Sequence, residues 1–299
     1  MGHEVSLNYK RQIQEAMWLT ALWRGLNVST MATFDPIGSI HCDPRYRYEA
    51  PRQGVLRPDN QAIIELAAGC DYEQALAGLD GFERIWVIFE LHLNESWQPL
   101  VQPPHEGVPK YGVFATRSPH RPNRIGMSCV RLLGIEGLRL RIAGHDLLDG
   151  TPVLDLKPYV PYADAFPAAV AGWLEDVTVQ RQSVHFEAMA VEQAAWIRQH
   201  AGLDCENFAH VQLMQDPTDG ERKRITPGDG PDTYVISYRT WRLDYFVAPE
   251  KSSVTITGIR SGYTAEDLAA DSVDRHGDKD AHRAFVQRFP VSPTPITRR

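Results

Sequence analysis

The sequence lacks several patterns that mark common protein classes. No Gly-x-Gly-x-x-Gly follows an apparent strand, so the usual dinucleotide-binding signature of α/β folds is missing. No Gly-x-Ser-x-Gly elbow indicates a serine hydrolase. No apolar run reaches the roughly 20 residues that a membrane-spanning helix needs. We therefore expect a cytoplasmic protein without a membrane partner.

Cysteine is scarce and histidine is scattered. The four cysteines include no Cys-x-x-Cys pair, so we expect them to be reduced and structural: Cys42, Cys70, Cys129 and Cys205. Histidines such as His41, His105 and His120 show no His-x-x-x-His spacing. The sequence therefore predicts no metal site.

Basic residues are outnumbered, with 31 Lys and Arg against 38 Asp and Glu and a formal net charge of −7. Non-specific affinity for nucleic acid comes chiefly from phosphate neutralisation, so this balance excludes a general nucleic-acid coat protein. Binding to RNA would have to use local clusters. Three such clusters are present: Arg45, Arg47, Arg52 and Arg57; Arg117, Arg121 and Arg124; and Arg222, Lys223 and Arg224.

The middle cluster lies in the most informative stretch of the chain. Gly112 to Arg117 is typical of a strand, and it runs into a loop that contains Pro119 and Pro122. Because each proline fixes φ, the loop holds its arginines on a stiff support. Planar guanidinium groups held in this way suit a carboxylate or a phosphate.

An acidic segment follows, from His145 to Tyr159. Asp149-Gly150 indicates a turn and Val153 to Leu156 a short buried strand, so Asp146 and Asp149 should lie on a loop beside that strand. The residues alone leave two interpretations open. The two oppositely charged segments could form a structural ion-pair network, or they could share a binding site.

Short strands with close turns predict a mainly β fold. Most of the strand-sized segments between Phe34 and Leu156 are separated by turn signals, which favours a closed antiparallel sheet, and a small α+β region follows from about Val184. The acidic, proline-interrupted end of the chain predicts a mobile tail. We expect four parts: an extension over residues 1–30, a β-barrel over 31–183, a small α+β domain over 184–264, and the tail over 265–299.

Four strings resemble those of one family. GVFATRSPHRPNRIGMS and DLLDGTPVLDLKPY, with Pro51-Arg52-Gln53-Gly54 and Leu91-His92-Leu93-Asn94 upstream, are similar to the TsaA-like, TrmO-type S-adenosylmethionine-dependent tRNA methyltransferases. The resemblance is strong from Phe34 to Val177 and looser from Ala188 to Gly262. It implies a single-sheet, non-Rossmann β-barrel that binds S-adenosylmethionine and forms a homodimer.

The resemblance also implies roles for individual residues. The residues expected to bind the cofactor are Gln53, Gly54, His92, Leu93, Arg117, Met127, Asp146, Leu147, Leu148 and Asp149. The catalytic residue is not identified, and the candidates are His92 and Asp149. The residues expected on the tRNA side are Arg52, Arg121, Asn123, Lys157, Asp216 and Arg222.

The function implied is methylation of the exocyclic nitrogen of threonylcarbamoyl-adenosine next to the tRNA anticodon. Two alternatives stay open. One is a methyltransferase for a small molecule, which would need no basic surface around its cleft. The other is a non-enzymatic S-adenosylmethionine-binding RNA module, in which the cofactor binds but no methyl group moves.

Overall fold

The computed structural model describes residues 33–103, 108–177, 181–250, 252–269 and 272–290. The chain divides into two compact units, Met1–Asp35 and Pro36–Arg299, and all the strands and helices that the structure describes lie in the second. The extension predicted over residues 1–30 lies outside the described residues.

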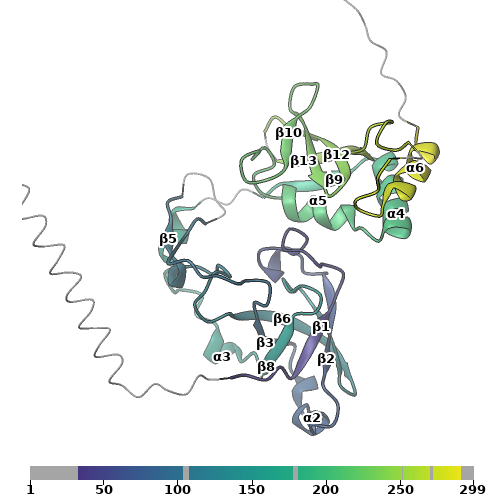
Figure 1. The fold of residues 1–299 in the computed structure, drawn as a ribbon. Helices are drawn as coiled ribbons and strands as arrows, with labels where there is room; N and C mark the ends of the chain where they lie inside the picture. Colours follow the sequence, from purple (N-terminus) through teal and green to yellow (C-terminus); the bar gives the residue numbers. More distant parts are fainter. Residues whose placement is uncertain (1–32, 104–107, 178–180, 251, 270–271, 291–299) are drawn as a thin grey trace, which may run out of the picture. The chain divides into compact units, whose positions relative to one another are not determined.

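Six antiparallel strands form the predicted closed barrel, in the order β1-β2-β7-β6-β3-β8 (Figure 1). Strand β8 closes it by pairing with both β3 and β1. The strands are β1 (Gly38–His41), β2 (Gln61–Leu66), β3 (Arg84–Glu90), β6 (Ile125–Glu136), β7 (Arg139–Ala143) and β8 (Pro152–Pro158). Short elements connect them: η1 (Gly54–Leu56), α2 (Tyr72–Ala75), η2 (Leu79–Gly81), β4 (Leu100–Val101), β5 (Tyr111–Gly112) and η3 (Val113–Ala115). Two more, α3 (Pro161–Asp164) and η4 (Gly172–Asp176), follow the last barrel strand.

The barrel forms because its strands alternate apolar and more polar positions. In β3, Ile85, Val87 and Phe89 are buried while the residues between them are only partly covered. This period of two places one row of side chains in the barrel interior. The core contains these residues together with partners such as Ile64 and Ile142.

A second sheet follows, in the order β10-β11-β12-β13-β9, with helices packed against it. We call this region the α+β part. Its elements are β9 (Ser183–Phe186), α4 (Ala188–Ala201), α5 (Cys205–Leu213), β10 (Ile225–Pro227), β11 (Thr233–Tyr238), β12 (Trp241–Val247), β13 (Ser253–Ser261) and α6 (Lys279–Arg288). Strand β9 pairs in parallel with β13, and the remaining pairs are antiparallel.

The prediction of a mobile tail over 265–299 is wrong for much of that range. Helix α6 buries Phe285 to 2% exposure, and Phe289 follows it into the same core as Trp241. The charged composition masked a helix that contributes one phenylalanine to the core and is followed directly by a second. The second core therefore extends past the predicted boundary at residue 264, and residues 291–299 lie outside the described residues.

The strand predicted from Gly112 to Arg117 is also wrong, because the chain turns into η3 after Gly112. Side chains take up the carbonyls that a strand would offer to a neighbour. Thr116 Oγ1 donates to the carbonyl of Val113 at 2.9 Å, and Arg121 Nη1 donates to the carbonyls of Val113 and Thr116 at 3.2 and 2.9 Å.

Among the described residues, no helix combines the length and the apolar character that crossing a membrane requires.

Candidate functional site

The arginine loop and the acidic bend approach each other at Asp146. This carboxylate accepts a hydrogen bond from the Ser128 hydroxyl on β6, directly after the GVFATRSPHRPNRIGM stretch. Burial raises the pKa of Asp146, while the Ser128 hydrogen bond and the charge of Arg117 act in the opposite direction. Arg117 is therefore close enough to interact electrostatically with Asp146. The two segments that the sequence singled out are brought together.

Gly54 is held against the start of the acidic bend. A Cβ at this position would lie 1.9 Å from the carbonyl oxygen of Gly144. Asn60 holds the start of the bend in place. Its side-chain Nδ2 donates to the carbonyl of His145 at 3.1 Å, and its backbone carbonyl accepts from Gly144 N at 2.9 Å. Only glycine permits this approach. The predicted pair Gln53-Gly54 therefore lies beside the predicted run from Asp146 to Asp149.

Asp149 forms two hydrogen bonds with the segment that follows β1. Its Oδ1 accepts the backbone N–H of Cys42 at 3.2 Å, and its own N–H donates to the carbonyl of Pro44 at 2.7 Å. Leu147 is buried in the barrel core, while Leu148 is half-buried. Burial raises the pKa of the Cys42 thiol to about 12, with the nearby Asp149 and Asp43 charges adding to the shift, so this cysteine stays protonated at neutral pH.

Large apolar side chains are exposed on β6 and in the turn that follows β3. Met127 directly precedes Ser128 on β6 and is 56% exposed, and Ile125 lies two residues before it on the same face. Leu93 is 46% exposed in the turn that follows β3, next to the half-buried His92. Because successive side chains of a strand point to opposite faces, Met127 and Ser128 project from opposite faces of β6.

The residues expected on the tRNA side of the barrel have different environments. Arg121 is half-buried and holds η3 together, so its predicted role in the substrate site competes with a structural one. Asn123 is exposed. Lys157 is exposed on β8, where its Nζ pairs with Asp155 at 2.8 Å. No described contact brings Lys157 to the Asp146 cluster.

Arg52, Asp216 and Arg222 do converge, although 163 residues separate Arg52 from its partner Gln215. Arg52 Nη1 approaches Gln215 Oε1 at 3.4 Å. Burial lowers the pKa of Arg52, and the charges of Asp216 and Arg222 also act on it. Arg222 in turn pairs with Asp219 at 2.5 Å. The barrel and the α+β part thus both contribute to this predicted group.

Sequence reasoning missed the importance of Lys223, which it treated only as one of three basic neighbours. Its Nζ donates to the carbonyls of Gln212, Gln215 and Asp216, the first at 2.7 Å and the last at 3.0 Å. It thereby caps the end of α5 and fixes the loop that carries Asp216. The only available signal was a lysine shortly after a helix.

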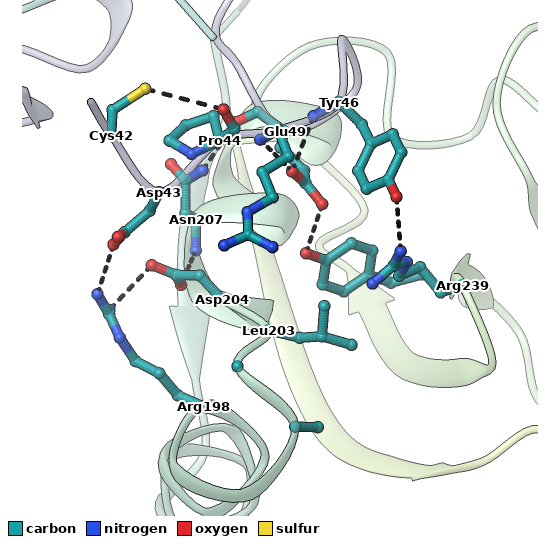
Figure 2. Close-up of a pocket in the computed structure, with 14 residues that line it drawn as sticks. Cys42, Asp43, Pro44, Tyr46, Glu49, Arg198, Leu203, Asp204, Asn207 and Arg239 are labelled. Atoms are coloured by element: carbon teal, nitrogen blue, oxygen red, sulfur yellow. Dashed lines mark hydrogen bonds and ion pairs between the residues drawn. The ribbon is translucent and has the colours of Figure 1, made fainter. Parts of the chain in front are cut away.

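A pocket of about 410 Å³ lies where the chain after β1 meets the α+β part (Figure 2). Glu49 is buried there; its carboxylate accepts from the Tyr238 hydroxyl at 2.8 Å and from the backbone N–H groups of Arg45 and Tyr46. Arg198 pairs with Asp43 at 2.8 Å and with Asp204 at 2.9 Å. Figure 2 shows its guanidinium group between the two carboxylates. Of the described residues that line this pocket, none belongs to the predicted cofactor set. No sequence pattern indicated this pocket.

Comparison with known proteins places the chain among methyltransferases. Residues 39–165 match the family model of the tRNA-methyltransferase O N-terminal domain. A tRNA (adenine(37)-N6)-methyltransferase of Escherichia coli is 33% identical over 222 residues, covering 72% of this chain and 91% of the relative. A Pseudomonas aeruginosa protein, RcsF, named as a candidate S-adenosylmethionine-dependent methyltransferase, is 37% identical over 231 residues, covering 76% and 97%.

A solved structure agrees with the sequence matches. The crystal structure of TrmO from Pseudomonas aeruginosa superposes with a TM-score of 0.55 and 32% identity, covering 78% of this chain and 100% of that chain. Long motifs, barrel topology and nearly full-length relatives all agree, and this chain belongs to the TrmO family.

Proposed function

We propose that this chain transfers a methyl group from S-adenosylmethionine to the exocyclic nitrogen of adenosine 37 in tRNA, next to the anticodon. The substrate that we favour is threonylcarbamoyl-adenosine. The observation that carries the proposal is the meeting of Arg117, Ser128 and Asp146, which joins the arginine loop to the acidic bend.

The residues at this cluster fit the chemical groups of the methyl donor. Asp146 suits a ribose hydroxyl or the donor's ammonium group, and Arg117 suits its carboxylate. The exposed side chains of Met127 and Leu93 offer apolar surface to an adenine ring. Gln53 and Gly54 lie against the same bend, which allows backbone contacts to the edge of the ring.

The protein's main task in this reaction is alignment. When bound, S-adenosylmethionine supplies a sulfonium methyl group that is open to in-line displacement. Holding the two reactants at near-attack distance lowers the barrier by several kcal/mol, on the order of what effective molarities allow. The close contact of Gly54 with Gly144 and the hydrogen bonds of Asp149 give the binding loops the required stiffness.

A proton acceptor would help, because a nitrogen that carries an acyl-type substituent is a poor nucleophile. The candidates remain His92 and Asp149. Cys42 N–H occupies Asp149 Oδ1, which fixes the carboxylate, while Asp149 Oδ2 has no hydrogen-bond partner among the described residues. His92 lies in the turn beside Leu93. Separate Asp149→Asn and His92→Ala variants distinguish the two by the pH dependence of kcat.

The tRNA side of the site is proposed to combine both parts of the molecule. Arg52 comes from the barrel and Asp216 and Arg222 from the α+β part, and their charges interact. Arginine suits a phosphate or the carboxylate of a threonylcarbamoyl group. The proposal retains the predicted boundary between a barrel that ends at residue 183 and an α+β domain that begins at residue 184. The barrel binds the methyl donor, and the α+β part completes the contact with the substrate.

A homodimer is part of the proposal. Phe114 is 75% exposed beside the arginine loop, and Ile125, Met127 and Leu93 are also exposed. Several large apolar side chains in one region are typical of a surface that a partner covers. A second copy of the chain could complete the cleft, as closed two-fold assemblies commonly do. We also propose that the protein acts in the cytoplasm, where tRNA is available.

The decisive experiment uses labelled S-adenosylmethionine. The purified chain is incubated with tRNA that carries or lacks the threonylcarbamoyl group, and the RNA is digested to nucleosides. We expect label only in the methylated form of threonylcarbamoyl-adenosine. Label in another nucleoside would refute the substrate assignment. Donor binding without any transfer to RNA would favour the non-enzymatic module.

A companion measurement tests the alternative of a small-molecule substrate. Arg222→Ala removes a cation from the proposed tRNA side and leaves the Asp146 cluster intact. We expect the KM for tRNA to rise while the Kd for the methyl donor stays constant. An unchanged KM for tRNA would count against a role for this surface.

A further inference from the structure

The segment Arg45–Tyr48 alternates arginine with tyrosine, and all four side chains are exposed. The rings of Tyr46 and Tyr48 stack in parallel, with centroids 5.4 Å apart and planes 1° apart. The side chains are 41% and 36% exposed. Two stacked tyrosines held at the surface form a rigid aromatic platform.

Cationic groups surround this platform. Arg239, in the turn between β11 and β12, lies with its guanidinium carbon 4.9 Å from the Tyr46 centroid, and its Nη2 donates to the Tyr46 hydroxyl at 2.8 Å (Figure 2). The Arg45 side chain has no hydrogen bond or ion pair to any described residue, although carboxylates line the same pocket.

Those carboxylates are already engaged. Arg198 pairs with both Asp43 and Asp204. Glu49 accepts hydrogen bonds from Tyr238 and from two backbone N–H groups. The pocket lining contains as many acids as arginines, but Glu49 is buried and Asp43 and Asp204 are paired with Arg198. The exposed guanidinium groups of Arg45 and Arg239 are therefore the charges that a phosphate would meet at the platform.

The platform is also continuous with the proposed methyl-donor site. Arg47 donates from its guanidinium to the backbone carbonyl of Leu93, one of the residues expected at the donor. Pro44, which directly precedes the segment, accepts the N–H of Asp149 at 2.7 Å. A molecule lying on the platform would therefore extend toward the cluster around Asp146.

We propose that Arg45, Tyr46, Tyr48 and Arg239 form a binding surface for single-stranded nucleotides of the tRNA that flank the methylated adenosine. Stacked aromatic rings with adjacent arginines match the chemistry by which proteins bind unpaired RNA, because each base offers a flat face and each phosphate a negative charge. A duplex hides its base faces and cannot use the platform. The inference rests on the proposed function, since it concerns the same RNA.

The test measures RNA binding directly. A fluorescent anticodon stem-loop and a fully paired duplex of equal length are titrated with the full chain at several salt concentrations. We compare Arg45→Ala, Tyr46→Ala and Tyr46→Phe with Arg275→Ala, which removes an exposed arginine outside the surface. Circular dichroism and the Kd for S-adenosylmethionine serve as controls for folding.

We expect Tyr46→Ala to weaken stem-loop binding roughly 5- to 100-fold, whereas Tyr46→Phe keeps the stacking and most of the affinity. Arg45→Ala should reduce the slope of log K against log salt by about 0.7 to 0.9, the loss of one phosphate contact. Arg275→Ala should change neither stacking nor the affinity contrast between stem-loop and duplex.

Failure of the inference and failure of the proposed function are distinguishable. If the unaltered chain methylates tRNA while Arg45→Ala and Tyr46→Ala keep its Kd, KM and salt slope, the surface is not an RNA contact and the function stands. A duplex that binds as well as the stem-loop also overturns the inference. If Arg45→Ala changes the oligomeric state instead of RNA affinity, the surface joins copies of this chain. Absence of any tRNA binding by the unaltered chain overturns both.

Discussion

The Ser128 hydroxyl donates a hydrogen bond to the carboxylate of Asp146, and this bond joins strand β6 to the acidic bend. The two residues are 18 positions apart and belong to the two strings that carry the family resemblance. Their hydrogen bond shows that these two segments of the sequence are close together in the folded chain. Asp146 is half-buried, and its charge matters for stability and for binding in opposite ways.

Asp146→Asn should stabilise the fold at neutral and alkaline pH while weakening the binding of S-adenosylmethionine. The folded-state pKa of Asp146 is raised, chiefly by burial, so its contribution to stability is full below the ordinary carboxyl pKa and is lost as pH rises through the raised value. The asparagine removes that loss. Donor affinity should fall by about tenfold or more, the scale of a hydrogen bond to a charged group.

Denaturation curves at pH 4 and pH 8 and calorimetric titration with S-adenosylmethionine check this prediction. The stability gain should be larger at pH 8 than at pH 4. A variant that binds the donor as tightly as the unaltered chain would remove Asp146 from the donor site.

Gly54→Ala should destabilise the barrel by about 1–3 kcal/mol, the usual cost of forcing an extra methyl group into a packed region. The new Cβ would lie 1.9 Å from the carbonyl oxygen of Gly144, so two backbone segments must separate. Donor binding should weaken as well, because both segments carry predicted donor contacts.

Gly112→Ala is the matched control for that variant. Its added Cβ would meet no atom within 4 Å, and its φ of −56° is open to alanine. Urea denaturation of both variants, with donor titration, makes the comparison. Equal stability of the two variants would contradict the assigned contact between Gly54 and Gly144.

Phe285→Ala should cost about 3–5 kcal/mol, as expected for a large cavity in a core. Phe285 is buried against Trp196, Trp241 and Phe289, with its ring centroid 4.8 Å from that of Trp241. Val286→Ala, at the next position of α6, removes a side chain that is 39% exposed and should cost far less. Thermal denaturation of the two variants compares them. Equal melting temperatures would mean that α6 is dispensable for the second core.

The sequence allowed the barrel to be predicted because its signal is local. Alternation in β3, visible at Ile85, Val87 and Phe89, is encoded within seven residues and is confirmed by the burial pattern. The proximity of Arg117 to Asp146 required the family resemblance, because charge alone could not distinguish a shared site from surface ion pairs.

The features that were missed depend on distant contacts. The side chain of Arg121 bonds to the carbonyl of Val113 and stabilises η3 in a stretch whose sequence is typical of a strand. The strand propensity of Val113 does not indicate this contact. Glu49 and Tyr238 form a buried hydrogen bond across 189 positions. Helix α6 was missed because the charged residues of this region outweigh Phe285 and Phe289 in any average over composition.

Lys223→Met should displace the loop that carries Asp216 and change the pH dependence of stability. Burial, together with the charge of Arg52, lowers the pKa of Lys223 to about 8, although three carbonyls accept from its Nζ. A lysine with a lowered folded-state pKa contributes stability that is present above its ordinary pKa near 10.5 and is lost as pH falls toward 8. The unaltered chain should therefore gain stability between about pH 8 and pH 10 relative to the methionine variant.

At pH 7.5 the Lys223→Met variant also leaves three carbonyls without their donor, which should cost about 1–3 kcal/mol. Urea denaturation at pH 7.5 and pH 10, with the KM for tRNA as a second readout, tests both effects. Equal KM values would separate the cap on α5 from the positioning of Asp216.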